Sequence, residues 1–356
     1  MRVSAKRLPP TTNPPRIVIA GGGLAGHRIA YALQNEAAVT LIDPKDYFEV
    51  PMAVPRMLVE PARACDAIVS YSEFLPRVEL VQAMVRSVQC DSVTTDFGEV
   101  AFDCLVLATG AGYAEDLIKA RGGAAGQRRS FMAETAERVR NAENIAIVGG
   151  GPVGVEIAGE ILEDLPRKKL TLIHSGSELL PSLTARPRQY ALAHLRRKGA
   201  NVLLGTPATQ KLLSEYDMIL WCAGYAGDTS YLKSYPETVL DPNGRVIVDR
   251  HLRLRGSTNI FAVGDITALP EPKLGIWAGK HASVVIANLR SLVSGSRKTL
   301  KTYRPATGSQ TMLVTLGRNH GAGHLPFGDF TNSWFARNVK SRDMFIGRYR
   351  KGIGLA

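Results

Sequence analysis

The chain begins with short apolar runs that alternate with segments of helical character. RIVIA (16–20) is an apolar run of strand length, HRIAYALQNE (27–36) has the pattern of a helix, and VTLID (39–43) is a second apolar run. A strand, a helix and a strand in this order predict a βαβ unit. FDCLVLATGAG (102–112) is a further apolar strand that leads into a Gly turn.

The same pattern occurs a second time. NIAIV (144–148) is a strand-like run, VEIAGEILEDL (155–165) is helix-like, LTLIHS (170–175) is the next strand, and YDMILWCAGYAG (216–227) repeats the character of residues 102–112. Two similar α/β units are the simplest explanation of this internal repeat. We therefore predict an α/β fold with two Rossmann-like dinucleotide-binding domains and a C-terminal capping segment.

Each unit places a Gly-rich turn between its first strand and its helix. Such a turn lets the backbone approach a pyrophosphate, and the N-terminus of the following helix stabilises the phosphate charge. The first turn supplies Gly21, Gly23 and Gly26, and Asp43 ends the next strand, where an acid binds ribose hydroxyls. The second supplies Gly149, Gly151 and Gly154. Two turns predict two dinucleotides, a bound FAD and an exchanging NADH or NADPH.

A third signal, NIFAVGDITALP (259–270), is a strand that ends in Gly-Asp. In a flavoprotein, Asp265 at this place holds the ribityl chain of FAD. A helix starting near Pro272 and Lys273 can point its N-terminus at the flavin. The further residues that we predict to bind the cofactors are Met84, Ala108, Gly110, Gly264, Lys273 and Trp277.

These motifs divide the chain into four parts. Residues 1–15 are rich in Pro and Thr and predict a flexible basic arm. The FAD-binding domain is expected to be discontinuous, with residues 16–115 and 245–300. The NAD(P)H-binding domain, residues 116–244, is inserted between them. Residues 301–356 are expected to cover the flavin site or to contact a membrane surface.

Composition and charge exclude several classes of protein. No run of about 20 apolar residues is present, which argues against a membrane-spanning helix. The four cysteines form no close pair, which argues against a disulfide scaffold or a zinc site. The net charge of +12 is concentrated at the ends, because residues 297–356 carry eleven Lys and Arg against two acids. Basic ends suit an anionic membrane or an acidic partner, or simply a solvated surface.

Several stretches carry a family resemblance. IVIAGGGLAG, AIVGGGPVGVEIAGEI, NIFAVGD, PKLGIWAGKHASVVIANL, GRNHGAGH and KSRDMFIGRYRK resemble the FAD/NAD(P)H two-dinucleotide-domain flavoprotein oxidoreductases. Within them the chain is similar to the branch of apoptosis-inducing-factor homologues and ferroptosis suppressor proteins. The resemblance spans roughly residues 16–351 and implies an FAD-dependent NAD(P)H:quinone oxidoreductase. It implies that Glu156, Glu160 and Lys340 are catalytic.

Three features depart from that branch. Position 2 is Arg, so the N-myristoylation signal is absent. The stretch between Leu203 and Tyr216 is short. KDYFEVPMAVPRM (45–57) lacks the histidine that relatives have near the flavin. The identity of the quinone is therefore left open.

The nicotinamide and the acceptor follow from fewer residues. The ribose position of the second unit holds His174 and Ser175, neither an acid nor an Arg, so we expect use of both NADH and NADPH. Residues 44–64 contain no Cys, which argues against disulfide reduction. The expected apolar walls of the quinone approach are Phe48, Pro51, Trp277 and Phe345. The alternatives are a reductase of a small protein electron carrier and a slow redox-sensing flavoprotein.

The end of the chain, WFARNVKSRDMFIGRYRK (334–351), mixes aromatic and basic residues. Drawn as one helix, it places Phe335, Val339, Ile346 and Tyr349 on one side, as in an element lying at a membrane interface. A segment packed over the flavin domain is the alternative. Nucleic-acid binding is disfavoured because no base-stacking or groove-reading motif is present. We expect an intracellular protein, cytoplasmic or peripherally membrane-associated, with mitochondrial association as a further alternative.

Overall fold

The structure is a computed structural model, and it describes residues 14–113, 115–225, 227–295, 299–307, 311–331 and 333–355. The predicted arm at residues 1–15 therefore lies outside the described residues except for its last two positions.

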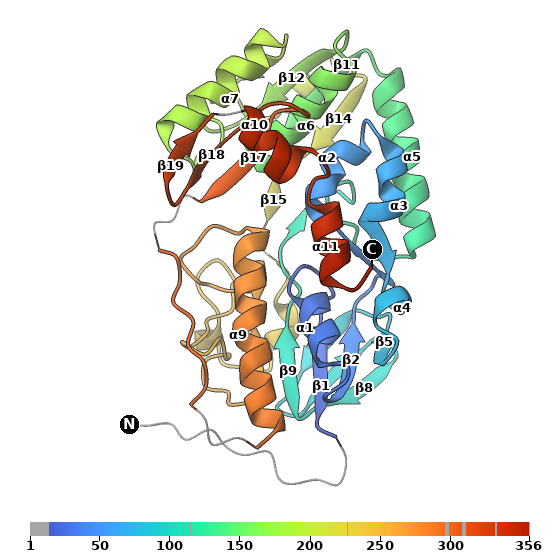
Figure 1. The fold of residues 1–356 in the computed structure, drawn as a ribbon, viewed down its shortest axis with the longest axis vertical. Coiled ribbons are helices and arrows are strands. Elements are labelled where there is room, and N and C mark those ends of the chain that lie inside the picture. The colour runs from blue at the N-terminus through green and yellow to red at the C-terminus, as the bar shows by residue number, and fades with distance from the viewer. Residues whose placement is uncertain are drawn as a thin grey trace.

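A parallel sheet of five strands organises the first unit (Figure 1). Its order is β16 (Ile260–Ala262), β9 (Cys104–Leu107), β1 (Arg16–Ala20), β2 (Ala38–Ile42) and β5 (Val78–Val81). In β1 and β2 every residue after the first is buried. A parallel strand covered on both faces needs such a continuous apolar run. The helices α1 (Gly26–Leu33) and α9 (Gly275–Val293) pack against each other on this sheet.

The second unit repeats this arrangement with four parallel strands. Its order is β13 (Asn201–Leu203), β12 (Lys169–Ile173), β11 (Asn144–Val148) and β14 (Met218–Trp221). As in the first unit, the strand that precedes the Gly turn lies between the next strand and a later one. The helix α6 (Pro152–Asp164) follows that turn. The predicted α/β fold with two Rossmann-like units is confirmed.

Smaller elements complete the two units. The helices are α2 (Val54–Met57), α3 (Ala64–Ala67), α4 (Tyr71–Phe74), α5 (Ala125–Asn141), α7 (Ala185–Arg197) and α8 (Gln210–Leu213). The strands are β3 (Tyr47–Glu49), β4 (Ile68–Ser70), β6 (Val85–Val88), β7 (Ser92–Thr95), β8 (Gly98–Ala101), β10 (Gly112–Tyr113) and β15 (Gly224–Tyr225). The antiparallel pair β10 and β15 joins the two units at their crossover connections.

The C-terminal residues form a third layer that lies along both units (Figure 1). Its antiparallel sheet consists of β17 (Met312–Thr315), β18 (Gly321–Leu325) and β19 (Gly328–Phe330), and it packs on α6 and α7. α10 (Ser333–Ala336) and a π-helical turn (Arg337–Ser341) follow, and α11 (Ile346–Gly352) contacts α3. Within the described residues, no helix has both the length and the apolar character needed to cross a bilayer.

The prediction of one continuous helix over residues 334–351 is wrong. Met344 and Phe345 adopt left-handed φ angles of 53° and 65°, which end the helical path before α11 begins. L-residues with side chains rarely adopt this conformation, so the break is a strained feature of the segment. As a result Val339 is exposed whereas Ile346 is buried, and the predicted apolar side does not exist as one face.

Candidate functional site

The two Gly turns share one local geometry. Gly21 and Gly149 have φ angles of 101° and 123°, which a side chain disfavours. At the third position of each turn, a Cβ on Gly26 would lie 1.8 Å from the carbonyl oxygen of Gly21, and one on Gly154 would lie 2.0 Å from that of Gly149. The first and third glycines are therefore required by the turn itself.

The second glycine of each turn has a different environment. A Cβ added to Gly23 or Gly151 would meet no described atom within 4 Å, so the protein leaves space on this side of each turn. Open space beside the N-terminus of α1 or α6 is what a pyrophosphate needs, because the unpaired N–H groups point there. Both turns fit a dinucleotide.

Asp43 lies next to the first turn, as its position at the end of β2 predicts. Its Oδ2 accepts a hydrogen bond of 2.5 Å from the N–H of Gly22. Its Oδ1 accepts from the backbone N–H and the Nζ of Lys45, at 2.8 and 2.7 Å. The hydroxyl of buried Tyr71 donates to the carbonyl oxygen of Gly22 at 3.1 Å. Contact between Asp43 and a ribose stays a prediction.

The loop after β9 brings a lysine to the first unit that the sequence did not reveal. Ala108 and Gly110 lie at the carboxyl end of β9, where Gly21 approaches Ala108. Lys119 Nζ donates to the carbonyl oxygens of Thr109 and Ala111, at 3.0 and 2.6 Å. Burial lowers the pKa of Lys119 to about 8. An ammonium held here suits an anionic or hydrogen-bonding part of a cofactor.

Asp265 lies in the turn that follows β16. Burial raises the pKa of its carboxyl, and the ammonium groups of Lys119 and Lys273 oppose this rise. Lys273 does not begin a helix, because α9 starts at Gly275; its Nζ donates to the carbonyl oxygens of Thr267 and Leu269. The sequence thus placed Lys273 in the site region but misplaced the start of the helix by two residues.

Two further predicted cofactor residues differ in burial. Trp277, in the first turn of α9, is buried, and its Nε1 has no hydrogen-bond partner among the described residues. Because a buried N–H without a partner is costly, this donor fits a ligand acceptor. Met84 follows β5 and is half exposed, and its backbone N–H donates to Asp96. With the open space at Gly23, the donor of Trp277 shows that the first unit fits FAD.

Glu156 and Lys340 meet, although they come from α6 and the π-helical turn. Lys340 Nζ donates to Oε1 of Glu156 at 2.5 Å and to the carbonyl oxygen of Leu313 at 3.2 Å. The backbone N–H of Thr315 donates to the same Oε1 at 3.0 Å. Glu156 and Lys340 are both buried. One carboxylate therefore joins the helix of the second Gly turn to the C-terminal segment.

Glu160, one helical turn further on, makes a buried ion pair that the sequence did not predict. Arg56 donates from Nε and Nη2 to the two oxygens of Glu160, at 2.5 and 3.0 Å. Nη2 of Arg56 also donates to the carbonyl oxygen of Ser341 at 3.0 Å. Arg56 is 2% exposed and Glu160 is fully buried. The guanidinium thus connects α2, α6 and the C-terminal segment, and it occupies both oxygens of Glu160.

The predicted apolar walls divide into different environments. Phe48 is a core residue, with its ring 3.8 Å from that of His27 and 5.9 Å from that of Tyr349. Pro51 is exposed, and Phe345 is half buried in its left-handed conformation. The prediction that Phe48 lines an open approach to the flavin is therefore wrong.

In the second unit β12 ends at Ile173, and His174 follows it, at the position where a ribose is predicted. The His174 ring lies under the Gly turn, 2.7 Å from where a Cβ of Gly150 would be. This contact explains why Gly150 has no side chain. Use of both NADH and NADPH stays a prediction.

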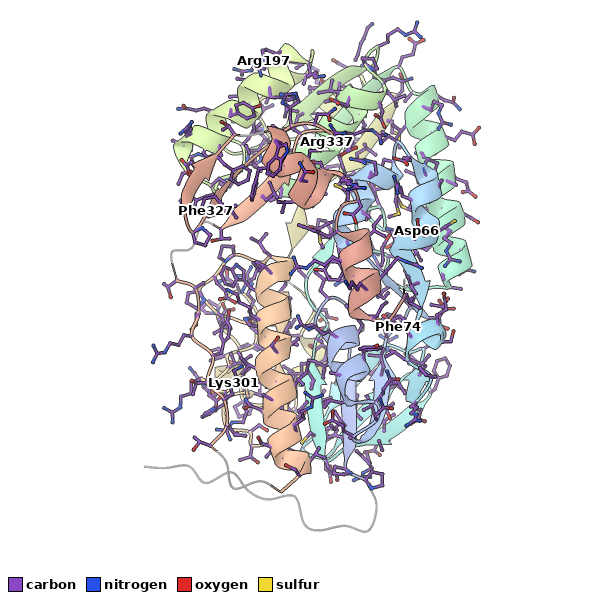
Figure 2. The ribbon with its side chains drawn as sticks, in the orientation of Figure 1. Asp66, Phe74, Arg197, Lys301, Phe327 and Arg337 are labelled. Carbon is purple, nitrogen blue, oxygen red and sulfur yellow. The ribbon has the colours of Figure 1, made fainter. Side chains whose placement is uncertain are left out.

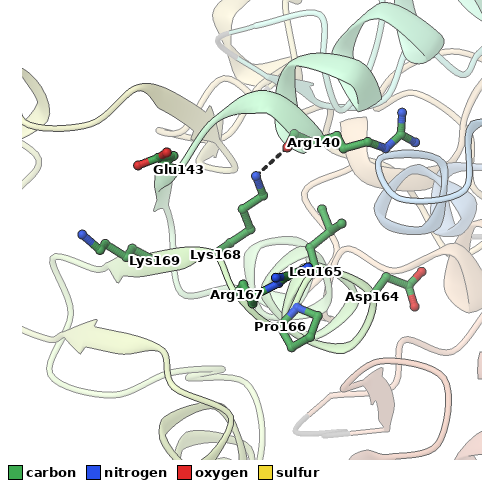
Figure 3. Close-up of a pocket in the computed structure, with 8 residues that line it drawn as sticks. All are labelled: Arg140, Glu143, Asp164, Leu165, Pro166, Arg167, Lys168 and Lys169. Carbon is green, nitrogen blue, oxygen red and sulfur yellow. Dashed lines mark hydrogen bonds between the residues drawn. The ribbon is translucent and has the colours of Figure 1, made fainter.

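A hollow of about 470 Å³ lies elsewhere on the second unit (Figure 3). Its lining residues are Arg140, Glu143, Asp164, Leu165, Pro166, Arg167, Lys168 and Lys169. They precede β11 or lie just before and at the first residue of β12, whereas the Gly turn follows β11, a strand of five residues. A strand of that length separates the hollow from the turn by about 16 Å, so it is not part of the dinucleotide site.

Comparison with known proteins agrees with this geometry. The family model of pyridine nucleotide-disulphide oxidoreductases matches residues 15–287. Human ferroptosis suppressor protein 1 is 32% identical over 363 residues, covering 93% of each chain, which confirms the predicted resemblance. The structure of NDH2 from Plasmodium falciparum in complex with NADH aligns with a TM-score of 0.75 at 15% identity, over 95% of this chain and 97% of that one. Sulfide:quinone oxidoreductase from Aquifex aeolicus aligns with a TM-score of 0.75 at 21% identity, over 95% and 92% of the two chains.

Proposed function

The chain belongs to the pyridine nucleotide-disulphide oxidoreductase family, and from this premise we propose that it is an NAD(P)H:quinone oxidoreductase. It is an oxidoreductase with FAD and NADH or NADPH as cofactors. Bound FAD would accept a hydride from NAD(P)H and pass two electrons to the quinone. In the overall reaction, NAD(P)H, a proton and a quinone yield NAD(P)⁺ and a quinol.

The acceptor is not a disulfide in this proposal, in spite of the family's name. Residues 44–64 contain no Cys. Cys104 and Cys222 are buried free thiols, and burial raises the pKa of each to about 12. A thiol with such a pKa is not a nucleophile near neutral pH.

The observation that carries the proposal is that the C-terminal segment combines buried polar contacts with exposed apolar side chains. Its inner face holds Lys340 against Glu156 and Ser341 against Arg56. The same segment exposes three large apolar side chains, Phe327, Trp334 and Val339, which are 76%, 71% and 41% exposed and are called here the C-terminal apolar patch. The segment thus contacts α6, the helix after the second Gly turn, and also exposes apolar side chains. This combination favours an apolar acceptor.

In this proposal Lys340 handles the proton of the reaction. Its Nζ holds protons within hydrogen-bond distance of Glu156, in a place from which water is largely excluded. Quinone reduction consumes a proton, and a buried ammonium beside a carboxylate can deliver it and be reprotonated. We assign this role to Lys340. We assign to Glu156 the role of orienting Lys340. Arg56 and Glu160 hold the segment in place.

The C-terminal apolar patch also favours contact with a membrane, where lipid-soluble quinones reside. Phe327 packs edge-on against Phe335, which adjoins Trp334 in α10. Arg337 follows α10 and is exposed (Figure 2). Exposed aromatic side chains next to arginines suit the headgroup region of an anionic bilayer. We propose that this patch rests on such a surface.

A comparison of acceptors tests the proposal against its alternatives. Oxidation of NADH or NADPH by the FAD-loaded protein is followed with a short-chain quinone, with a ferredoxin-like protein and with oxygen. Preference for the quinone supports the proposal. Preference for the protein, with a rate that falls steeply as salt is raised, would instead support a protein carrier as the acceptor.

A further inference from the structure

The turn after β16 presents Asp265 in an unusual state. Gly264 has a φ of 75°, and residues Gly264–Ile266 form a single 3-10 turn. Within the described residues, the Asp265 carboxylate makes no hydrogen bond or ion pair, and its side chain is partly buried. A partly buried acid without partners is available to a ligand. Its position therefore depends on what holds the turn.

The turn is held by His281 of α9. The backbone N–H of Gly264 donates to Nδ1 of His281 at 2.9 Å. Nδ1 accepts this bond, so it carries no proton, and the proton of the neutral ring lies on Nε2. Nε2 is 2.6 Å from Oε1 of Glu271. His281 is 1% exposed, so water offers no alternative partner. The two contacts together fix one tautomer.

Glu271 is itself held by two residues at the start of the C-terminal segment. Its Oε2 accepts from the hydroxyl of Tyr303 at 2.7 Å and from the backbone N–H of Ala306 at 3.1 Å. The ring of Tyr303 meets that of His281 edge-on at 4.5 Å. Every polar atom of the path from Ala306 to Gly264 has a partner.

We propose that His281 is a positioning residue of the flavin site: it accepts from the N–H of Gly264 and so fixes the turn that presents Asp265, while Glu271 fixes its tautomer. His281 does not touch the cofactor in this account. The inference rests on FAD as the cofactor and not on quinone as the acceptor, so failure of the acceptor proposal leaves it unaffected.

The chain allows a matched pair of polar variants. In His281→Asn the side-chain oxygen can take the place of Nδ1 and accept from Gly264, but the contact with Glu271 is lost. In His281→Gln the longer amide can still reach Glu271, but the N–H of Gly264 loses its acceptor. The cost of a buried N–H without a partner corresponds to about a tenfold change in an equilibrium constant.

The experiment is a titration of each full-length apoprotein with FAD, followed by flavin fluorescence and by visible circular dichroism. We expect His281→Asn to bind FAD within about threefold of the unaltered protein, and His281→Gln to bind about tenfold more weakly with an altered dichroism spectrum. Tyr303→Phe, which removes one donor to Glu271 but no contact of His281 with Gly264, serves as the control and should bind normally.

Three results would overturn the proposal. They are equal FAD affinity of His281→Gln and the unaltered protein, equal weakening of both variants, and the reverse order of the two. If a variant does not fold, as judged by far-ultraviolet circular dichroism, the imidazole nitrogen resonances of the unaltered holoprotein decide. A proton on Nε2 is expected, and a proton on Nδ1 of His281 would refute the contact with Gly264.

Discussion

The Nζ of Lys340 lies 2.5 Å from Oε1 of Glu156, although 184 positions separate the two residues along the chain. A buried lysine beside a buried glutamate is costly to desolvate and must be paired well. Here the pair joins the C-terminal segment to the first turns of α6. The packing of the segment against α6 and the charge on Glu156 therefore depend on each other.

Lys340→Met should therefore affect stability and turnover separately. It leaves the Glu156 carboxylate with the N–H of Thr315 as its remaining donor, which should lower the free energy of unfolding by about 3–5 kcal/mol. The double variant Glu156→Gln, Lys340→Met removes both charges and should recover most of that stability, but quinone turnover should stay about a hundredfold low. Urea unfolding and steady-state rates measure the two effects. Full turnover in the double variant would refute a proton-handling role.

The Gly turns predict a loss of binding without a loss of fold. Gly23→Ala and Gly151→Ala place a methyl group where no described atom lies within 4 Å, so unfolding of the apoprotein should change by less than about 0.5 kcal/mol. Gly23→Ala should weaken FAD binding more than tenfold. Gly151→Ala should spare FAD but raise the KM for NADH.

Gly126→Ala in α5 is the matched control for these two variants, because its new methyl group also meets no described atom. It should leave both cofactors unaffected. Normal FAD affinity in Gly23→Ala would mean that the pyrophosphate does not pass over this turn.

His27 predicts a loss of stability in mild acid. Burial lowers the pKa of its imidazole to about 4, while in the unfolded chain it is about 6.5. Between these values the unfolded chain binds a proton that the folded one does not, so the free energy of unfolding falls as the pH falls. From pH 7 to pH 5 this one group contributes a loss of about 2 kcal/mol.

His27→Asn tests this effect, because its amide can still donate to the carbonyl oxygen of Gly23, the partner of His27 Nδ1. Urea unfolding of both proteins at pH 7 and pH 5 gives the comparison. We expect a smaller difference between the two pH values in the variant. The same difference in both proteins would show that His27 titrates normally in the fold.

The C-terminal apolar patch predicts binding to anionic vesicles. The unaltered protein should co-sediment with vesicles of phosphatidylcholine and phosphatidylglycerol, and Phe327→Ser, Trp334→Ser should bind at least tenfold less. Phe97→Ser is the matched control, because Phe97 is 80% exposed on the turn between β7 and β8. Turnover with a water-soluble quinone should be unchanged in all of these variants. Equal loss of binding in the control would assign the effect to general hydrophobicity.

The repeated pattern of apolar runs and Gly turns was sufficient to predict the two units, because each strand before a Gly turn is buried along nearly its whole length. It could not predict the break at Met344 and Phe345. A helical wheel assumes one continuous helix, whereas Met344 and Phe345 adopt left-handed φ angles, a conformation that residues with side chains rarely adopt and that an apolar pattern does not indicate.

The site was predicted where the residue type is tied to a turn and missed where it depends on tertiary contact. Arg56 stands in the apolar run AVPRMLV, and a charge in such a run is a signal of a buried partner, but the sequence does not say that the partner is Glu160. Lys119 has no local signal at all, because only folding brings its Nζ to the carbonyl oxygen of Thr109.

The most direct test of the central claim is anaerobic stopped-flow absorbance of the bound flavin. The FAD-loaded protein is mixed with NADH or NADPH, and the bleached protein is then mixed with a short-chain ubiquinone or, separately, with oxygen. We predict fast bleaching, followed by recovery that is much faster with the quinone than with oxygen. Fast bleaching with recovery by neither would contradict the claim that a quinone is the acceptor.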